Sequence, residues 1–145
     1  MMKFKFPVLV VANIEHSIAF YEEIVGARVA MSFSDVVVFE GGFALTTRDK
    51  KSGAEVSSTI LRFEDADFDG LLSYLEYCKE IEYKQQCVIL DTGQRYIAFY
   101  DLDNNIIEVL EDVETVISRL LKSGMTLESI SEKTGYPIEF VRRFI

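Results

Sequence analysis

The sequence predicts an α+β protein built from two βαβββ units and a small C-terminal helical tail. Short β-branched runs alternate with amphipathic helical segments, which indicates mixed secondary structure. The same order of elements occurs twice, because laying one unit over the other pairs Phe6 with Ile60 and Asn13 with Asp67. From Val113 onward only helical spacing remains.

The first unit covers about residues 4–47. Residues 6–12 predict a strand, and Asn13 is placed to cap a helix over Ile14–Val25 that Gly26 ends. Three further strands are expected, with Gly41-Gly42 as the turn before the last: Ala27–Ser34, Val36–Glu40 and Phe43–Thr47.

The second unit covers about residues 56–112 and follows a polar linker at Arg48–Glu55. Ser57–Phe63 predicts its first strand, and Asp67 opens a helix with apolar residues on one side. Its remaining strands are expected at Gln86–Leu90, Arg95–Tyr100 and Ile106–Leu110.

Residues 113–145 form the tail, so we expect a domain over residues 1–112 and a helical extension over 113–145. Apolar spacing predicts one helix near Val116–Leu121, and Thr126 caps a second that Gly135 ends. Pro137 begins a final helical segment.

Composition excludes several classes of protein. The 145 residues are 49% hydrophobic and 27% charged, as in ordinary globular proteins. A formal charge of −9 repels phosphate backbones and anionic lipid, so we expect no nucleic-acid and no membrane partner. No apolar run approaches the roughly 20 residues of a membrane helix, and Met1–Pro7 lacks a secretion signal, which predicts a cytoplasmic protein.

Two segments resemble a known family. VVANIEHSIAFYEEIVGARV, at the first strand and helix, and YIAFYDLDNNIIEVLE, near the end of the second unit, resemble the vicinal-oxygen-chelate superfamily. This superfamily groups glyoxalase, bleomycin-resistance and extradiol-dioxygenase proteins, and the resemblance covers about residues 4–112. Leu102 and Asn104 stand where the family usually has proline and glycine, and asparagine tolerates the left-handed backbone that such a turn needs.

The resemblance implies that the strands of both modules curl into a ligand-binding cup with the helices outside. Many members hold a divalent metal there, at positions that correspond here to Phe6, Leu45, Ile60 and Glu108. Three of these four are apolar, and one carboxylate cannot hold a cation against water. The only histidine, His16, lies among glutamates on an amphipathic helix. We therefore expect no metal and no other cofactor.

Alternation along the strands places Arg62 and Glu108 in the cup, where an ion pair would serve as structural filler or as a polar handle for a ligand. In the alternative, Arg62 reaches out of the rim and Glu108 is hydrated. The same alternation predicts an apolar lining from Phe6, Val8, Val10, Phe43 and Leu45, together with Ile60.

The residues assemble no nucleophile with a neighbouring base and no phosphate loop, so catalytic residues stay unassigned. The preferred function is metal-independent binding of a small, largely apolar molecule. One alternative is a metal-dependent lyase or dioxygenase of the glyoxalase type. Another is a regulatory or scaffold module, because MTLESISEKTGYPIEFVRRFI resembles a helix-turn-helix segment. By analogy with the family, a homodimer is expected.

Overall fold

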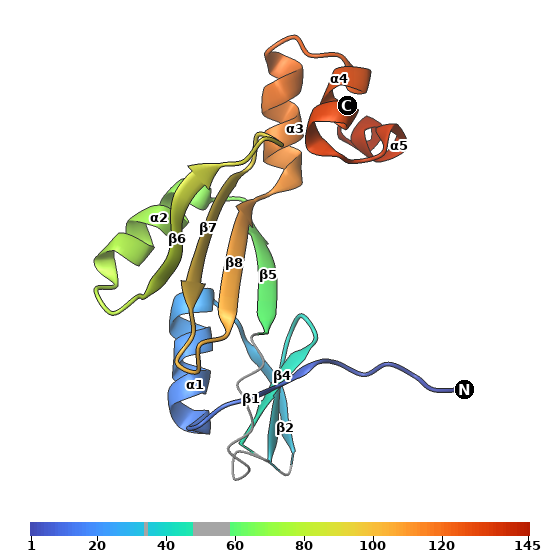
Figure 1. Cartoon of the computed structure of the whole chain (residues 1–145). Coiled ribbons are helices and arrows are strands. Elements are labelled where there is room, and N and C mark those ends of the chain that lie inside the picture. The colour runs from blue at the N-terminus through green and yellow to red at the C-terminus, as the bar shows by residue number, and fades with distance from the viewer. Residues whose placement is uncertain (34, 48–58) are drawn as a thin grey trace. The chain divides into compact units, whose positions relative to one another are not determined.

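The computed structural model describes residues 1–33, 35–47 and 59–145 and divides the chain into two compact units (Figure 1). The first unit comprises residues 1–59 and 101–105, and the second comprises residues 60–100 and 106–145. Each unit contains a four-stranded mixed sheet, so the predicted pair of βαβββ modules with C-terminal helices is confirmed. The linker expected at Arg48–Glu55 and the first residues of the strand expected at Ser57–Phe63 lie outside the described residues.

The first sheet has the strand order β1-β4-β3-β2. The outer strand β1 runs parallel to β4, and the other neighbours are antiparallel. The strands span β1 (Val8–Val10), β2 (Val29–Phe33), β3 (Val36–Phe39) and β4 (Phe43–Thr46).

The helix of the first unit consists of α1 (Ile14–Phe20) and a π-helical continuation, η1 (Tyr21–Val25). The Asn13 side chain caps it as expected, because Oδ1 accepts a hydrogen bond of 2.9 Å from the His16 amide. Gly26 ends the helix with φ of 77°, a left-handed conformation that glycine adopts without steric cost.

The second sheet repeats this topology in the order β5-β8-β7-β6, again with its first strand parallel to its last. The strands span β5 (Ile60–Asp65), β6 (Tyr83–Ile89), β7 (Arg95–Tyr100) and β8 (Ile106–Glu111). Helix α2 (Phe68–Tyr77) packs on one face through the buried Phe68 and Leu75, and Asp67 caps it by accepting a hydrogen bond from the Gly70 amide.

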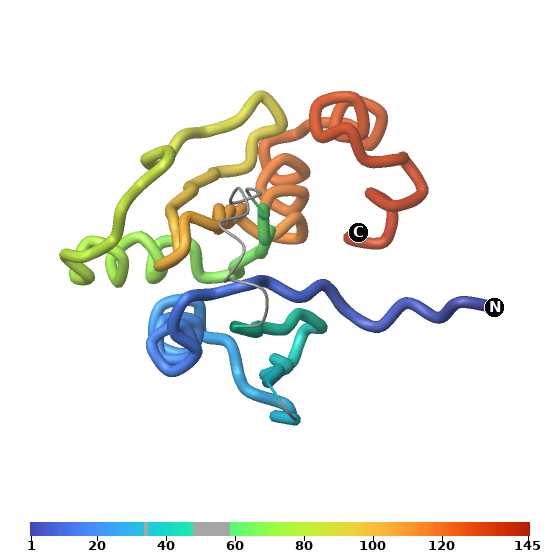
Figure 2. Tube along the Cα trace, turned by 60° about the horizontal axis from the view of Figure 1, so that its bottom comes forward, coloured from blue at the N-terminus to red at the C-terminus, as the bar shows by residue number. Residues whose placement is uncertain are grey.

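The tail consists of α3 (Val113–Lys122), α4 (Leu127–Thr134), α5 (Ile138–Val141) and a final 3₁₀ turn, η3 (Arg142–Phe144). The trace in Figure 2 shows these segments folded back on one another. Ile117, Ile130 and Val141, one from each helix, are fully buried and form a core with the apolar residues around them. Among the described residues, no helix has the length and apolar character that crossing a membrane requires.

Candidate functional site

Register in the second sheet places Arg62 of β5 directly beside Glu108 of β8. Arg62 Nη2 lies 3.4 Å from Glu108 Oε1, so the expected ion pair is present. The two side chains differ sharply in environment, since that of Glu108 is 11% exposed and that of Arg62 is 66% exposed. The largely buried carboxylate of Glu108 is thus balanced by the guanidinium of Arg62, which extends into solvent.

A second polar group, the hydroxyl of Tyr96 on β7, lies on the same face of the sheet and interacts with the Glu108 side chain. Burial, followed by the hydrogen-bonding and charge effects of Glu108, raises the pKa of Tyr96 to about 12, and the positive charge of Arg62 offsets part of that rise. The hydroxyl is therefore protonated at neutral pH and carries a proton that it can donate to the carboxylate. Sequence analysis did not single out Tyr96, although it placed the strand Arg95–Tyr100 correctly.

The residues around Arg62, Glu108 and Tyr96 are largely apolar. Residues paired in register share a face of the sheet, so Ile60 and Ile106 accompany Arg62 and Glu108 on the face opposite α2, with Ala98 across from Glu108. Ile60 is 55% exposed, whereas Ala98, Ile106 and Leu110 are buried. The face therefore offers hydrocarbon beside one polar cluster, Arg62–Glu108–Tyr96.

In the first sheet, the expected lining residues divide between two faces. Val8 aligns with Ala44, and Leu9 aligns with Leu45, so Leu45 and Val8 point to opposite sides. Phe43 and Leu45 belong to the face that packs against the helix of the first unit, where the Tyr21 ring lies 5.5 Å from that of Phe43. The prediction that Phe43 and Leu45 share a lining face with Val8 is therefore wrong.

The face opposite α1 carries Val8 and Val10, which are 43% and 42% exposed. Phe6 packs there against the buried cluster Val36, Val38 and Ala44. Of the residues predicted to line a site, Phe6, Val8 and Val10 thus share one face of the first sheet, and Ile60, Arg62 and Glu108 share one face of the second.

The strand registers of the two sheets also correct the prediction that Leu45 is the counterpart of Glu108 in the first module. Val8 corresponds to Arg62 in the repeat, and Val8 aligns with Ala44, so the counterpart is Ala44 and not Leu45. The error arose because the first residues after the two turns, Phe43 and Ile106, were taken as equivalent, whereas the pairing of β1 with β4 is displaced from that alignment by one residue.

The side chains at these positions do not fit a divalent cation. Phe6, Ala44 and Ile60 have no donor atoms, and the carboxylate of Glu108 already contacts Arg62 and the Tyr96 hydroxyl. Within residues 1–33, 35–47 and 59–145, no three or more His, Cys, Asp or Glu side chains gather in a metal-binding arrangement.

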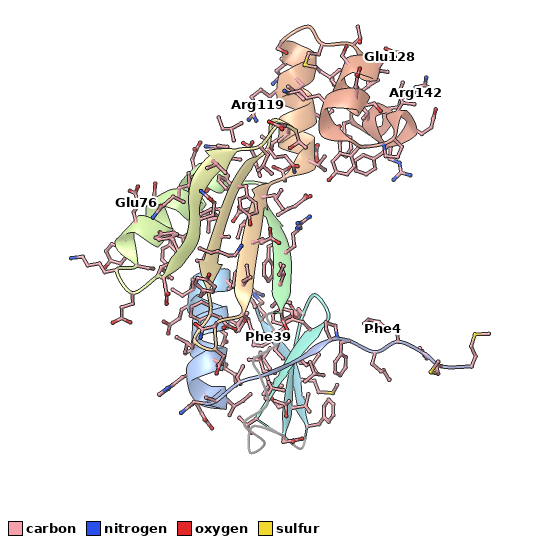
Figure 3. The ribbon with its side chains drawn as sticks, viewed as in Figure 1. Phe4, Phe39, Glu76, Arg119, Glu128 and Arg142 are labelled. Atoms are coloured by element: carbon pink, nitrogen blue, oxygen red, sulfur yellow. The ribbon has the colours of Figure 1, made fainter. Side chains whose placement is uncertain are left out.

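A second ionic cluster, which sequence analysis missed, joins the tail to the second sheet. Glu111, at the end of β8, is 1% exposed, and its carboxylate accepts hydrogen bonds from Arg95 Nη2 at 2.9 Å and Arg119 Nη2 at 2.8 Å. Hydrogen bonds from Arg119, outweighing burial, lower the pKa of Glu111 to about 2. Arg119 also donates to the Gly93 carbonyl, and Figure 3 shows it on α3.

Comparisons with known proteins agree with this topology. The sequence profile of the glyoxalase-like domain matches residues 4–114. A protein of unknown function from Agrobacterium tumefaciens str. C58 is 28% identical, with a TM-score of 0.64 over 78% of this chain and 96% of the other.

Two more distant structures share the fold. Lactoylglutathione lyase from Agrobacterium tumefaciens is 20% identical, with a TM-score of 0.59 over 73% of this chain and 91% of that enzyme. TioX from Micromonospora sp. ML1 is 11% identical, with a TM-score of 0.60 over 75% of this chain and 98% of TioX. No curated protein sequence matches the chain. Because the profile spans most of the sequence and the structure has both βαβββ modules, the chain belongs to the glyoxalase-like domain family.

Proposed function

We propose that this protein binds a small, largely apolar molecule without the help of a metal, on the face of the second sheet opposite α2. The observation that carries the proposal is a carboxylate, Glu108, held out of water among apolar residues while its cationic partner extends into solvent. Small-molecule sites typically combine an apolar surface with a few polar groups that orient the ligand. Glu108, Arg62 and Tyr96 are those groups, and Ile60 supplies apolar surface beside them.

The first module offers a similar apolar surface without the polar groups, on the face that carries Phe6 and Val8. We propose these two residues as secondary candidates for apolar contact. We leave Phe43 and Leu45 out of the proposed set because they belong to the opposite face, which packs against the helix of the first unit.

Calorimetric titration with a panel of small apolar compounds, each carrying one polar group, tests the proposal. Saturable binding that weakens in Glu108→Gln is the expected result. A matched control is Glu139→Gln, because Glu139 is an exposed glutamate that pairs with Arg142 in the tail. If no compound binds, the binding proposal fails. If the purified protein instead contains stoichiometric metal that Glu108→Gln removes, metal-dependent lyase or dioxygenase chemistry replaces it.

We further propose the division into a domain over residues 1–112 and an extension over 113–145. The Glu111–Arg119 contact supports an extension that packs on the domain instead of acting as a separate DNA-binding arm. A salt-sensitive gel shift with duplex DNA would reverse this view. A homodimer and a cytoplasmic location stay predictions, tested by light scattering and cell fractionation.

A further inference from the structure

The weakest contact of the polar cluster is the one between Glu108 and Arg62. It consists of a single contact of 3.4 Å, and most of the Arg62 side chain is in solvent. Water screens an ion pair whose cation lies mostly in solvent, and a long arginine side chain loses freedom on pairing, so both effects weaken the hold of Arg62 on Glu108. Arg62 is therefore a partner that another cation can replace at Glu108.

Glu108 itself cannot leave. It lies within the six-residue strand β8, between β5 and β7, and its side chain is 11% exposed. A carboxylate in such a place needs a positively charged or hydrogen-bonding partner whenever Arg62 moves away. Tyr96 interacts with this carboxylate but supplies no positive charge.

The charges around the cluster favour a cationic ligand over an anionic one. Glu64 lies two residues from Arg62 on the same strand and on the same face, and the whole chain carries a formal charge of −9. An anionic ligand that approached Arg62 would meet both Glu64 and Glu108. A cation that approached Glu108 would be attracted by both.

We propose that the ligand of this site is an apolar molecule bearing a protonated amine, and that its ammonium group displaces Arg62 from Glu108. This inference rests on the proposed function and adds the chemical class of the ligand. Arg62 then acts as a counter-ion that occupies Glu108 until the ligand arrives, and the exposed Ile60 offers apolar contact to the body of the ligand. The neutral Tyr96 hydroxyl stays beside the carboxylate and does not compete with the ligand for its charge. The rise in the pKa of Tyr96 is consistent with this reading, because the negative charge of Glu108 outweighs the opposing effect of Arg62 at that hydroxyl.

The experiment compares phenethylamine, hydrocinnamate and phenethyl alcohol, which share an aromatic body and differ in the charge of the head group. Titration calorimetry at neutral pH measures each against the full-length protein and its variants. Phenethylamine is expected to bind tightest, and Glu108→Gln should weaken it roughly tenfold or more, since a hydrogen bond to a charged group contributes over 1.4 kcal/mol. Arg62→Ala should tighten phenethylamine binding several-fold, because it removes the competitor.

The Arg62 variant keeps the test decisive if Glu108→Gln fails to fold, since Arg62 is exposed. Its matched control is Arg142→Ala, which removes the same charge from an exposed ion pair in the tail and should leave binding unchanged. Tightest binding of hydrocinnamate, with loss in Arg62→Ala, would overturn the proposal and make Arg62 an anion-binding residue. Equal binding of all three compounds, unaffected by either variant, would overturn the amine assignment while leaving an apolar binding site. Binding of none would instead show that the proposed function itself is wrong.

Discussion

The hydroxyl of Tyr21 donates a hydrogen bond of 2.6 Å to Oδ2 of Asp101, a residue 80 positions along the chain. Oδ1 of the same carboxylate accepts the amides of Asp103 and Asn105, both at 2.8 Å, and so closes the turn between β7 and β8. Asp103 in turn accepts from the Ala12 amide at 2.9 Å. These bonds explain why residues 101–105 belong to the first compact unit although the strands beside them belong to the second.

Replacing Tyr21 with phenylalanine removes one bond to Asp101 and leaves the ring contacts with Phe39 and Phe43 in place. A buried acceptor that loses one of its partners costs about 1–3 kcal/mol, and we expect a value near 1 because Asp101 keeps three other bonds. Urea denaturation measures the change in the free energy of unfolding. Tyr77→Phe, at a residue that is 82% exposed, should have no effect, and equal stability of both variants would show that the bond contributes nothing.

Asn104 is the one non-glycine residue with positive φ in the described part of the chain, at 63°. The sequence-based expectation that asparagine would preserve this turn is therefore confirmed. Asn104→Ala should lose about 1 kcal/mol, because a Cβ without a compensating polar group is strained in the left-handed region, whereas Asn104→Gly should be nearly neutral. Thermal unfolding of the two variants checks the order. An alanine variant as stable as the glycine variant would contradict the strain argument.

Local signals explain what could be predicted from the sequence. Asn13, Asp67 and Thr126 each accept a backbone amide within three residues, and Gly26 and Gly135 end helices with positive φ. Such contacts depend only on neighbours in the chain, so the order of strands and helices followed from them. The Arg62–Glu108 pair could also be predicted from the sequence, because alternation along two parallel strands is enough to place both residues on one face.

The errors share a different cause, since each depends on partners distant in the chain. Strand β6 begins at Tyr83 and not at Gln86, because an exposed edge strand can carry polar residues that give no alternating pattern. The face of Leu45 depends on its pairing with Leu9 of β1, which no residue near Leu45 in the sequence indicates. Glu111 had no visible partner in the sequence because Arg95 and Arg119 come from a neighbouring strand and a later helix.

Tyr96 should ionise near pH 12, which absorbance at the phenolate wavelength measures directly. Because the folded state holds this pKa above the ordinary tyrosine value of 10.0, Tyr96 contributes stability that is complete below about pH 10 and lost as the pH rises through 12. The corresponding titration step should vanish in Tyr96→Phe. Arg62→Ala should raise its midpoint and Glu108→Gln should lower it, since the two charges act in opposite directions. A midpoint that neither variant moves would mean that Tyr96 does not sense the pair.

The tail has a core of its own, with Ile130 completely buried between α3 and α5. Ile130→Ala should cost about 2–4 kcal/mol in the local stability of the tail, as large-to-small substitutions in a core do. Hydrogen exchange followed by mass spectrometry should show faster exchange in α4 and α5, with β7 and β8 unchanged. A control at the exposed Glu128, also in α4, is Glu128→Ala. Faster exchange throughout both sheets would show that the tail and the sheets unfold as one unit.

Glu111 links the acid stability of the protein to the docking of α3. Its pKa falls from 4.5 to about 2 in the folded state, so its contribution is complete above pH 4.5 and is lost as the pH falls through 2. A shift of this size corresponds to roughly 3 kcal/mol, which we reduce to about 2 because Arg119 is half-exposed and water screens its charge. Glu111→Gln should therefore lose about 2 kcal/mol near neutral pH and show a flatter decline in stability below pH 4.5. Urea denaturation across this range measures both effects, with Glu139→Gln as the control for an exposed glutamate–arginine pair. Parallel pH profiles for Glu111→Gln and the parent protein would mean that Arg95 and Arg119 contribute nothing through their charge, and that apolar packing alone holds α3 in place.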